Sequence, residues 1–160
     1  MPLGFDFQPL VIAQKLASKM FAEIGVRLEW RTSGLCAEND IVITLSYKTP
    51  DEQLPAAWAY ALPFDGRHVV VFWDRIQRKM PPARAPIVLA HVLAHEVTHI
   101  LQGVPRHSES GLMKPLWTSA DYFEMGRKPL PFTTEDVILI QRGLEARQNG
   151  TPVAAESAAK

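Results

Sequence analysis

Two histidines and a glutamate in the stretch His95-Glu96-Val97-Thr98-His99 have the types and spacing needed for metal chemistry. Residues four apart on a helix lie one turn above each other on the same face, so both imidazoles can reach one metal ion. Glu96 projects to the side of that pair, where its carboxylate can hydrogen-bond a water on the metal. Two nitrogen ligands and such a carboxylate are what a zinc hydrolase needs. We therefore predict a metal site here, with Glu96 as its general base.

The sequence around this stretch favours the same interpretation. Residues 87–101 are apolar almost all the way round a helical wheel, which is typical of a helix buried in the middle of a domain. Charged residues are almost never fully buried unless they are paired or bound to a metal. His91 also precedes His95 by four residues, but that pair would leave Val92 at the position of the base. We therefore expect His95 to act with His99, and His91 to be a packed or supporting residue.

Composition bounds the class of protein. The 160 residues suit one domain, and we expect it to cover residues 1–148, with a disordered tail at 149–160. Hydrophobic residues make up 47%, and no apolar stretch is long enough to span a bilayer. Seventeen basic residues balance seventeen acidic ones, so neither a nucleic-acid nor an anionic-membrane partner is indicated. The single cysteine, Cys36, excludes an internal disulfide.

The chain before the histidine stretch reads as one helix followed by strands. Apolar residues recur every three or four positions over 9–24, which predicts an amphipathic helix that ends at Gly25. Alternating or continuous apolar runs then predict strands at 26–31, 41–47, 57–62 and 68–73.

The chain after these strands contains two expected helices and two irregular segments. Residues 77–86 read as a loop before the central helix, and the chain is expected to be irregular from Gly103 to about residue 131. A last helix begins with Thr133 or Thr134 as its cap, and Gly143 weakens it near its end. Strands followed by a central helix that packs on them indicate an α+β fold.

A third ligand is needed, because catalytic zinc normally takes three protein ligands and leaves a position for water. The central helix is expected to end at Gly103, where a glycine can turn the chain with a positive φ. His107 follows four residues later and can close a site of three histidines. Alternatively, a downstream carboxylate supplies the third ligand, and the candidates are Glu109, Glu124 and Glu135.

These residues resemble a known family. The stretch from His95 to His107, followed by Gly111-Leu112-Met113-Lys114-Pro115, resembles the zinc signature and methionine turn of the metzincin metallopeptidases, in particular small bacterial, matrixin-like members. The resemblance implies a Zn²⁺ ion held by His95, His99 and His107, with Glu96 as the base and Met113 beneath the metal. The spacings on either side of the glycine are each one residue longer than usual in the family. The helix must therefore end a residue later or contain a bulge.

The resemblance also implies an architecture. The family has an N-terminal helix, a mixed sheet of about four strands, a buried zinc-binding helix and a C-terminal helix. Residues 57–63 resemble its antiparallel edge strand, which lines the cleft and can bind an extended peptide. Leu116, Trp117 and Tyr122 follow the methionine turn, where the family builds a substrate pocket. Tyr122 is the candidate for contact with the tetrahedral intermediate.

The predicted function is that of a zinc-dependent endopeptidase that hydrolyses peptide bonds with a zinc-bound water activated by Glu96. Its partners are a peptide or protein substrate, and we expect a monomer. The alternatives are a zinc peptidase with a downstream glutamate ligand and a non-catalytic, metal-stabilised peptide-binding module. No signal peptide is recognisable, although the resemblance favours a secreted or periplasmic protein. The neighbours of Cys36 do not match the family's latency motif, so we expect a bystander thiol.

Overall fold

The structure is a computed structural model that describes residues 6–49, 57–61 and 66–149. Within these ranges the fold is α+β, with five helices and a three-stranded mixed sheet. The helices are α1 (Gln8–Ala22), α2 (Trp73–Lys79), α3 (Ala85–Gln102), α4 (Ser119–Met125) and α5 (Thr134–Gln148). The strands are β1 (Val42–Ser46), β2 (Ala59–Ala61) and β3 (His68–Phe72).

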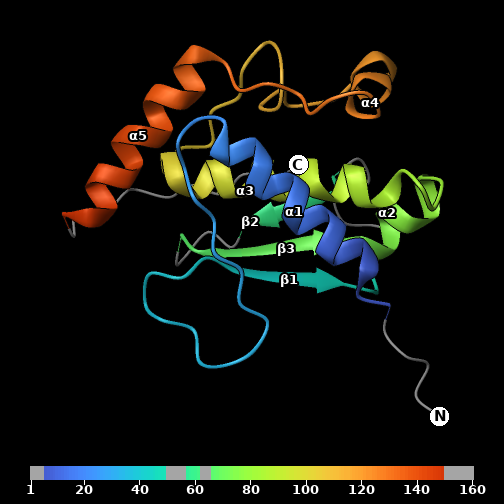
Figure 1. Cartoon of the computed structure of the whole chain (residues 1–160), viewed down its shortest axis with the longest axis horizontal. Helices are drawn as coiled ribbons and strands as arrows, with labels where there is room; N and C mark the ends of the chain where they lie inside the picture. The colour runs from blue at the N-terminus through green and yellow to red at the C-terminus, as the bar shows by residue number, and fades with distance from the viewer. Residues whose placement is uncertain (1–5, 50–56, 62–65, 150–160) are drawn as a thin grey trace.

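The sheet has the order β1-β3-β2. β1 runs parallel to β3, with Val42 opposite His68, and β2 runs antiparallel to β3, with Ala59 opposite Val71. Val69 and Val71 of the central strand are fully buried. The β-branched run predicted over 68–73 therefore forms the middle of the sheet, which lies below α3 in Figure 1.

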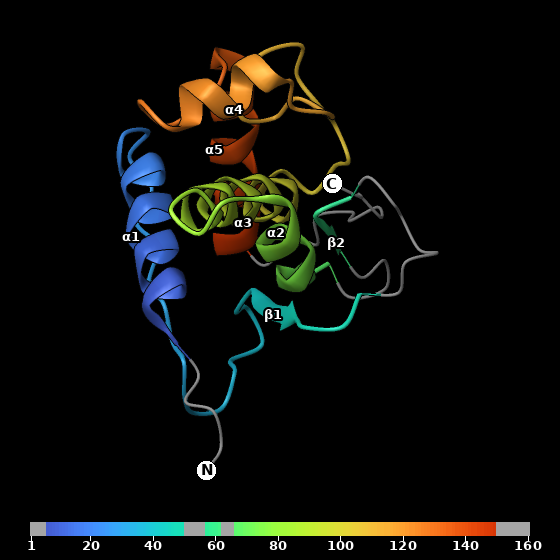
Figure 2. The same ribbon diagram turned by 90° about the vertical axis from the view of Figure 1, so that its right-hand side faces the viewer.

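Helix α3 lies at the centre of the fold. Every one of its residues except Ile87 is buried. Figure 2 looks nearly along this helix and shows α1 beside it, β1 below it and α4 above it. Helices α1, α2 and α5 also contact it directly. The apolar pattern over 87–101 therefore belongs to a buried central helix, as its helical wheel predicted.

Helices α1 and α5 cover α3 through small or apolar side chains. The buried residues of α1 share one face and are Ala13, Ala17, Met20 and Phe21. On α5, a Cβ added at Gly143 would lie only 1.5 Å from the carbonyl oxygen of Leu101. The glycine that reduces the helix propensity of α5 therefore lets its backbone approach α3 closely.

The strand expected at residues 26–31 is not formed, and that prediction is wrong. Its side chains do alternate in burial, with Val26 buried and Leu28 and Trp30 half-buried. The contacts run through side chains, because the indole Nε1 of Trp30 donates to Ser18 Oγ of α1 at 2.7 Å. Alternating burial arises here from packing against a helix, without a backbone ladder.

Other boundaries also differ from expectation. α1 ends at Ala22 with Glu23 as its C-cap, so the prediction that it runs to residue 24 and ends at Gly25 is wrong. β3 ends at Phe72, and α2 begins directly after it, so 77–79 belong to a helix and not to the expected loop. The segment expected to be irregular from 103 to 131 contains α4. Its Thr118 and Asp121 form a capping box, a local signal that the sequence carried. The expected edge strand is β2, which is shorter than predicted because residues 57 and 58 are not part of it, and residues 62 and 63 lie outside the described residues.

The remaining expectations concern the ends and the surface. Helix α5 ends at Gln148, Asn149 is its C-cap, and the rest of the expected tail lies outside the described residues. None of the helices in the described ranges is long and apolar enough to cross a membrane. Cys36 is exposed and has a free thiol.

Candidate metal centre

Three histidines from two segments converge beside the C-terminal half of α3. His95 and His99 come from the helix, and His107 comes from the chain that returns after it. One potential ligand atom from each lies within 4.8 Å of the other two, and within the described residues no other group of histidines, cysteines or acids meets this criterion. The Nε2 atoms of His95 and His99 are 2.9 Å apart. Two nitrogen ligands of one tetrahedral zinc ion lie about 3.3 Å apart, so a shift of a few tenths of an ångström suffices.

The part of the site on α3 is buried, and His107 is half-buried. His95 and Glu96 are fully buried, and His99 is 5% exposed. The ring of His107 is 5.4 Å from that of His95 and 4.9 Å from that of His99, measured between centroids. Burying Glu96 together with His95 and His99 on one helix is costly in an apolar core, and a bound cation would offset that cost.

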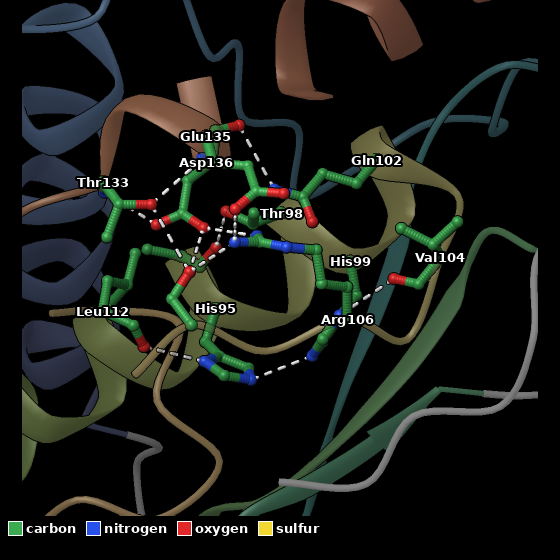
Figure 3. Close-up of polar contacts among 12 residues, drawn as sticks. His95, Thr98, His99, Gln102, Val104, Arg106, Leu112, Thr133, Glu135 and Asp136 are labelled. Carbon is green, nitrogen blue, oxygen red and sulfur yellow. Dashed lines mark hydrogen bonds and ion pairs between the residues drawn. The ribbon is translucent and has the colours of Figure 1, made fainter. Parts of the chain in front are cut away.

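Backbone carbonyls hold the two helical histidines in the tautomer that a metal needs. Nδ1 of His95 is 2.9 Å from the carbonyl oxygen of Leu112, and Nδ1 of His99 is 3.3 Å from that of Val104 (Figure 3). A carbonyl only accepts, so each Nδ1 carries the proton and donates it. In a neutral ring this leaves the Nε2 lone pair available for a metal, which is the usual arrangement of ligating histidines.

The turn that carries Leu112 depends on a glycine. Gly111 has a φ of +75°, and a Cβ at this position would lie 2.2 Å from the carbonyl oxygen of Pro131. That same oxygen accepts a hydrogen bond from the backbone N–H of Leu112 at 2.9 Å. Met113 is fully buried in this turn, and its carbonyl oxygen accepts from the N–H of Ser108 at 2.8 Å. The turn is therefore joined both to His95 and to the residue after His107.

Helix α3 ends as the sequence predicted. Gly103 adopts a φ of +69°, and its N–H donates to the carbonyl oxygen of His99 at 2.9 Å. The helix is regular through Gln102. The longer spacing to the glycine is therefore accommodated by a later helix end and not by a bulge.

The chain around His107 is fixed to the start of α5 by Asp136. The fully buried Oδ1 of Asp136 accepts from Arg106 Nη1 at 2.8 Å and from Ser108 Oγ at 2.6 Å (Figure 3). Burial by itself raises the pKa of Asp136, but the hydrogen bonds from Ser108, Arg106 and Thr133 outweigh it and hold the pKa below its ordinary value.

His91 is a packed residue, as the sequence favoured. Its Nδ1 donates to the carbonyl oxygen of Ile87 at 2.8 Å, and its Nε2 accepts from the N–H of Leu130 at 3.1 Å. Burial lowers the pKa of His91 to about 4, and the bond to Ile87 opposes that shift in part. The ring is neutral near pH 7, with both nitrogens engaged.

The hydroxyl of Tyr122 is hydrogen-bonded to Trp58. Its Oη accepts from Trp58 Nε1 at 2.9 Å, and its ring lies edge-on to Trp117 at 6.1 Å between centroids. Trp117 in turn lies edge-on to His95 at 5.9 Å. Burial raises the pKa of Tyr122, the bond from Trp58 lowers it, and nearby Asp121 raises it, with a net increase. The role of Tyr122 toward an intermediate stays a prediction.

The downstream glutamates do not join the pair on α3. Glu109 is exposed. Glu124 Oε1 lies 3.6 Å from Arg127 Nη1, and Glu135 Oε2 lies 2.9 Å from Arg106 Nη2. His107 is the residue that lies close enough to share a metal ion with His95 and His99.

Comparison with protein-family models, with curated proteins and with solved structures gave no match to this chain. The donor set itself indicates the chemistry. Three imidazole nitrogens suit zinc and related divalent ions. A carboxylate next to the first ligand adds a group that can move a proton.

Proposed function

We propose that this chain is a zinc-dependent endopeptidase of the metzincin type. The observation that carries the proposal is the convergence of His95, His99 and His107, with the fully buried Glu96 directly after the first of them. A structural zinc site is usually closed by four protein ligands, whereas a catalytic one keeps a position for water. Three histidines with a neighbouring carboxylate correspond to the catalytic kind.

Each residue has a defined task in this reaction. Zinc, when bound, acts as a Lewis acid that acidifies water and polarises a carbonyl. The imidazoles of His95 and His99 bind through Nε2, because their Nδ1 atoms donate to carbonyl oxygens. The carboxylate of Glu96 takes a proton from the attacking water and delivers it to the nitrogen of the leaving amine. The buried surroundings of Glu96 exclude other water from this transfer.

The sheet offers a means of holding an extended peptide. Within the described residues β2 pairs only with β3, so it is an edge strand with main-chain groups on its other side. β2 also packs against α3, the helix of the two ligands. Main-chain hydrogen bonds to such an edge bind peptides with little dependence on their side chains.

The buried turn at Met113 supports the metzincin assignment within this proposal. Met113 is fully buried, and the neighbouring Leu112 carbonyl orients His95. In the proposed family, a methionine in a tight turn lies beneath the metal, and Met113 would take that position here. That assignment is part of the proposal and is tested with it.

The proposal is tested by replacing the base while leaving the ligands intact. We compare zinc content and cleavage of an unstructured protein substrate in wild type and Glu96→Gln. The matched control is Glu109→Gln, which changes an exposed glutamate. Glu96→Gln is expected to keep one zinc per chain and to lose about 10²–10⁴-fold in kcat/KM, the usual contribution of a general base. Glu109→Gln is expected to have the zinc content and kcat/KM of wild type. A chelator is expected to abolish cleavage by wild type and by Glu109→Gln.

Two results would count against the proposal. Cleavage by Glu96→Gln at the wild-type rate would remove Glu96 from the reaction. A wild-type protein that binds zinc but cleaves nothing in a broad peptide library would instead be a metal-stabilised binding module.

A further inference from the structure

We propose that Asp136 is the positioning residue that holds His107 in place to bind the metal. The inference depends on the proposed metal site and adds a residue that lies on a different helix. It concerns the third ligand, because this ligand is the one that α3 does not carry.

His107 needs an anchor that the other two ligands do not need. His95 and His99 have their separation fixed by one regular helix. His107 lies outside any helix or strand. A ligand that moves by about 1 Å loses much of its contribution to a preorganised site.

Asp136 holds both neighbours of His107 with a single oxygen atom. Its Oδ1 accepts from Arg106 Nη1 at 2.8 Å and from Ser108 Oγ at 2.6 Å. Bonds to an ionised carboxylate are stronger than neutral ones, and the Asp136 side chain is completely buried. The residues before and after the ligand are therefore fixed to the same point.

That point is itself fixed to α3. The carbonyl oxygen of Asp136 accepts from Gln102 Nε2 at 3.2 Å, at the end of the helix that carries the other two ligands. Its other carboxylate oxygen accepts from the N–H of Thr133 at 2.7 Å, in the capping box of α5. Asp136 thus connects the helix with two ligands to the segment with the third.

A purely structural role for Asp136 is the competing explanation, and the chain contains a matched control for it. Asp121 occupies the same position in the capping box of α4, with Thr118 as its N-cap. Its carboxylate is also paired with a base, since Oδ2 lies 2.6 Å from Lys114 Nζ. Asp121 holds neither neighbour of a histidine ligand.

The experiment measures zinc affinity by competition with a chromophoric chelator in wild type, Asp136→Asn and Asp121→Asn. Circular dichroism and thermal unfolding of the metal-free proteins establish how much each substitution costs in stability. Asp136→Asn is expected to lower zinc affinity about 10–100-fold, the usual effect of losing a group that orients a ligand. Asp121→Asn is expected to leave the affinity unchanged. Equal losses in the two variants would overturn the proposal.

A double-mutant cycle then connects the effect to His107. In a His107→Ala background, Asp136→Asn is expected to cause no further loss of zinc affinity. A further loss of the same size would overturn the positioning role. If Asp136→Asn does not fold, Ser108→Ala replaces it, because it removes the 2.6 Å bond while leaving the Thr133 cap intact. A wild-type protein that binds no zinc would refute the metal site itself, which is a different outcome.

Discussion

The orientation of each buried histidine is set by the backbone oxygen that its ring contacts. His95 and His99 each donate from Nδ1 to one carbonyl, which leaves Nε2 pointing toward the other ligands. His91 has the same bond at Nδ1, but its Nε2 accepts from Leu130. The same residue type, on the same helix, is thereby a candidate ligand at two positions and a packed residue at the third.

The neutral state of His91 predicts a pH-dependent stability. Its pKa is about 4 in the folded protein and 6.5 ordinarily, so the unfolded chain takes up a proton first as pH falls. The contribution of the neutral ring is fully present above pH 6.5 and is lost as pH falls to about 4. The difference in pKa corresponds to about 3 kcal/mol.

The measurement is urea unfolding of metal-free wild type and His91→Gln at several pH values. The stability difference between the two proteins is expected to shrink by about 3 kcal/mol between pH 7.5 and pH 4, because glutamine does not titrate. A difference that is independent of pH would show that His91 is not held neutral by burial.

The sequence identified the candidate ligand side chains, but it did not identify the backbone carbonyls that orient them. The spacing of His95, Glu96 and His99 is local, so it could be recognised without the fold. The carbonyls of Leu112 and Val104 could not be predicted, because every residue has one and only the tertiary structure brings these two to the rings.

The close approach of α5 to α3 at Gly143 predicts that a larger side chain there destabilises the protein. Alanine is a better helix former than glycine by about 1 kcal/mol, but its Cβ would lie 1.5 Å from the Leu101 oxygen. A clash with backbone in a packed core costs about 1–3 kcal/mol or more. We therefore expect Gly143→Ala to destabilise the protein by at least about 1 kcal/mol in urea unfolding, in spite of its helix propensity.

Gly25→Ala serves as the control for Gly143→Ala. Gly25 has a φ of +79° and no atom within 4 Å of an added Cβ, so its cost is limited to backbone strain of about 1 kcal/mol. If Gly143→Ala proved neutral or stabilising, α5 would not cross α3 as closely as described.

The ends of α3 and α5 were easier to predict than the strand pairing, for a physical reason. The caps at Gly103 and Thr133 act within one turn, and both helix ends lie where these residues predicted. A strand requires a partner elsewhere in the chain. Residues 26–31 have the alternating pattern but pack on α1 through side chains such as Trp30.

The whole molecule places a helix of almost completely buried residues at its centre and builds the candidate site along it. The sheet, α1 and α5 all pack on α3, as Figures 1 and 2 show. The site combines α3, the segment with His107 and the start of α5. The sequence predicted the contributions of α3 and of the segment with His107. It did not predict that of Asp136, because Ser108 and Arg106 lie 28 and 30 residues away and their hydrogen bonds to Asp136 form only in the folded chain.

Elemental analysis of zinc shows whether the three histidines hold one metal ion. It is carried out on purified wild type, His107→Ala and Glu124→Ala after dialysis against a limiting concentration of zinc. Glu124 is one of the carboxylates that the sequence left open as a third ligand, and it lies 3.6 Å from Arg127. We expect one zinc per chain in wild type and in Glu124→Ala, and a much lower zinc content in His107→Ala because its affinity is reduced. Wild-type zinc content in His107→Ala, or none in wild type, would contradict this expectation.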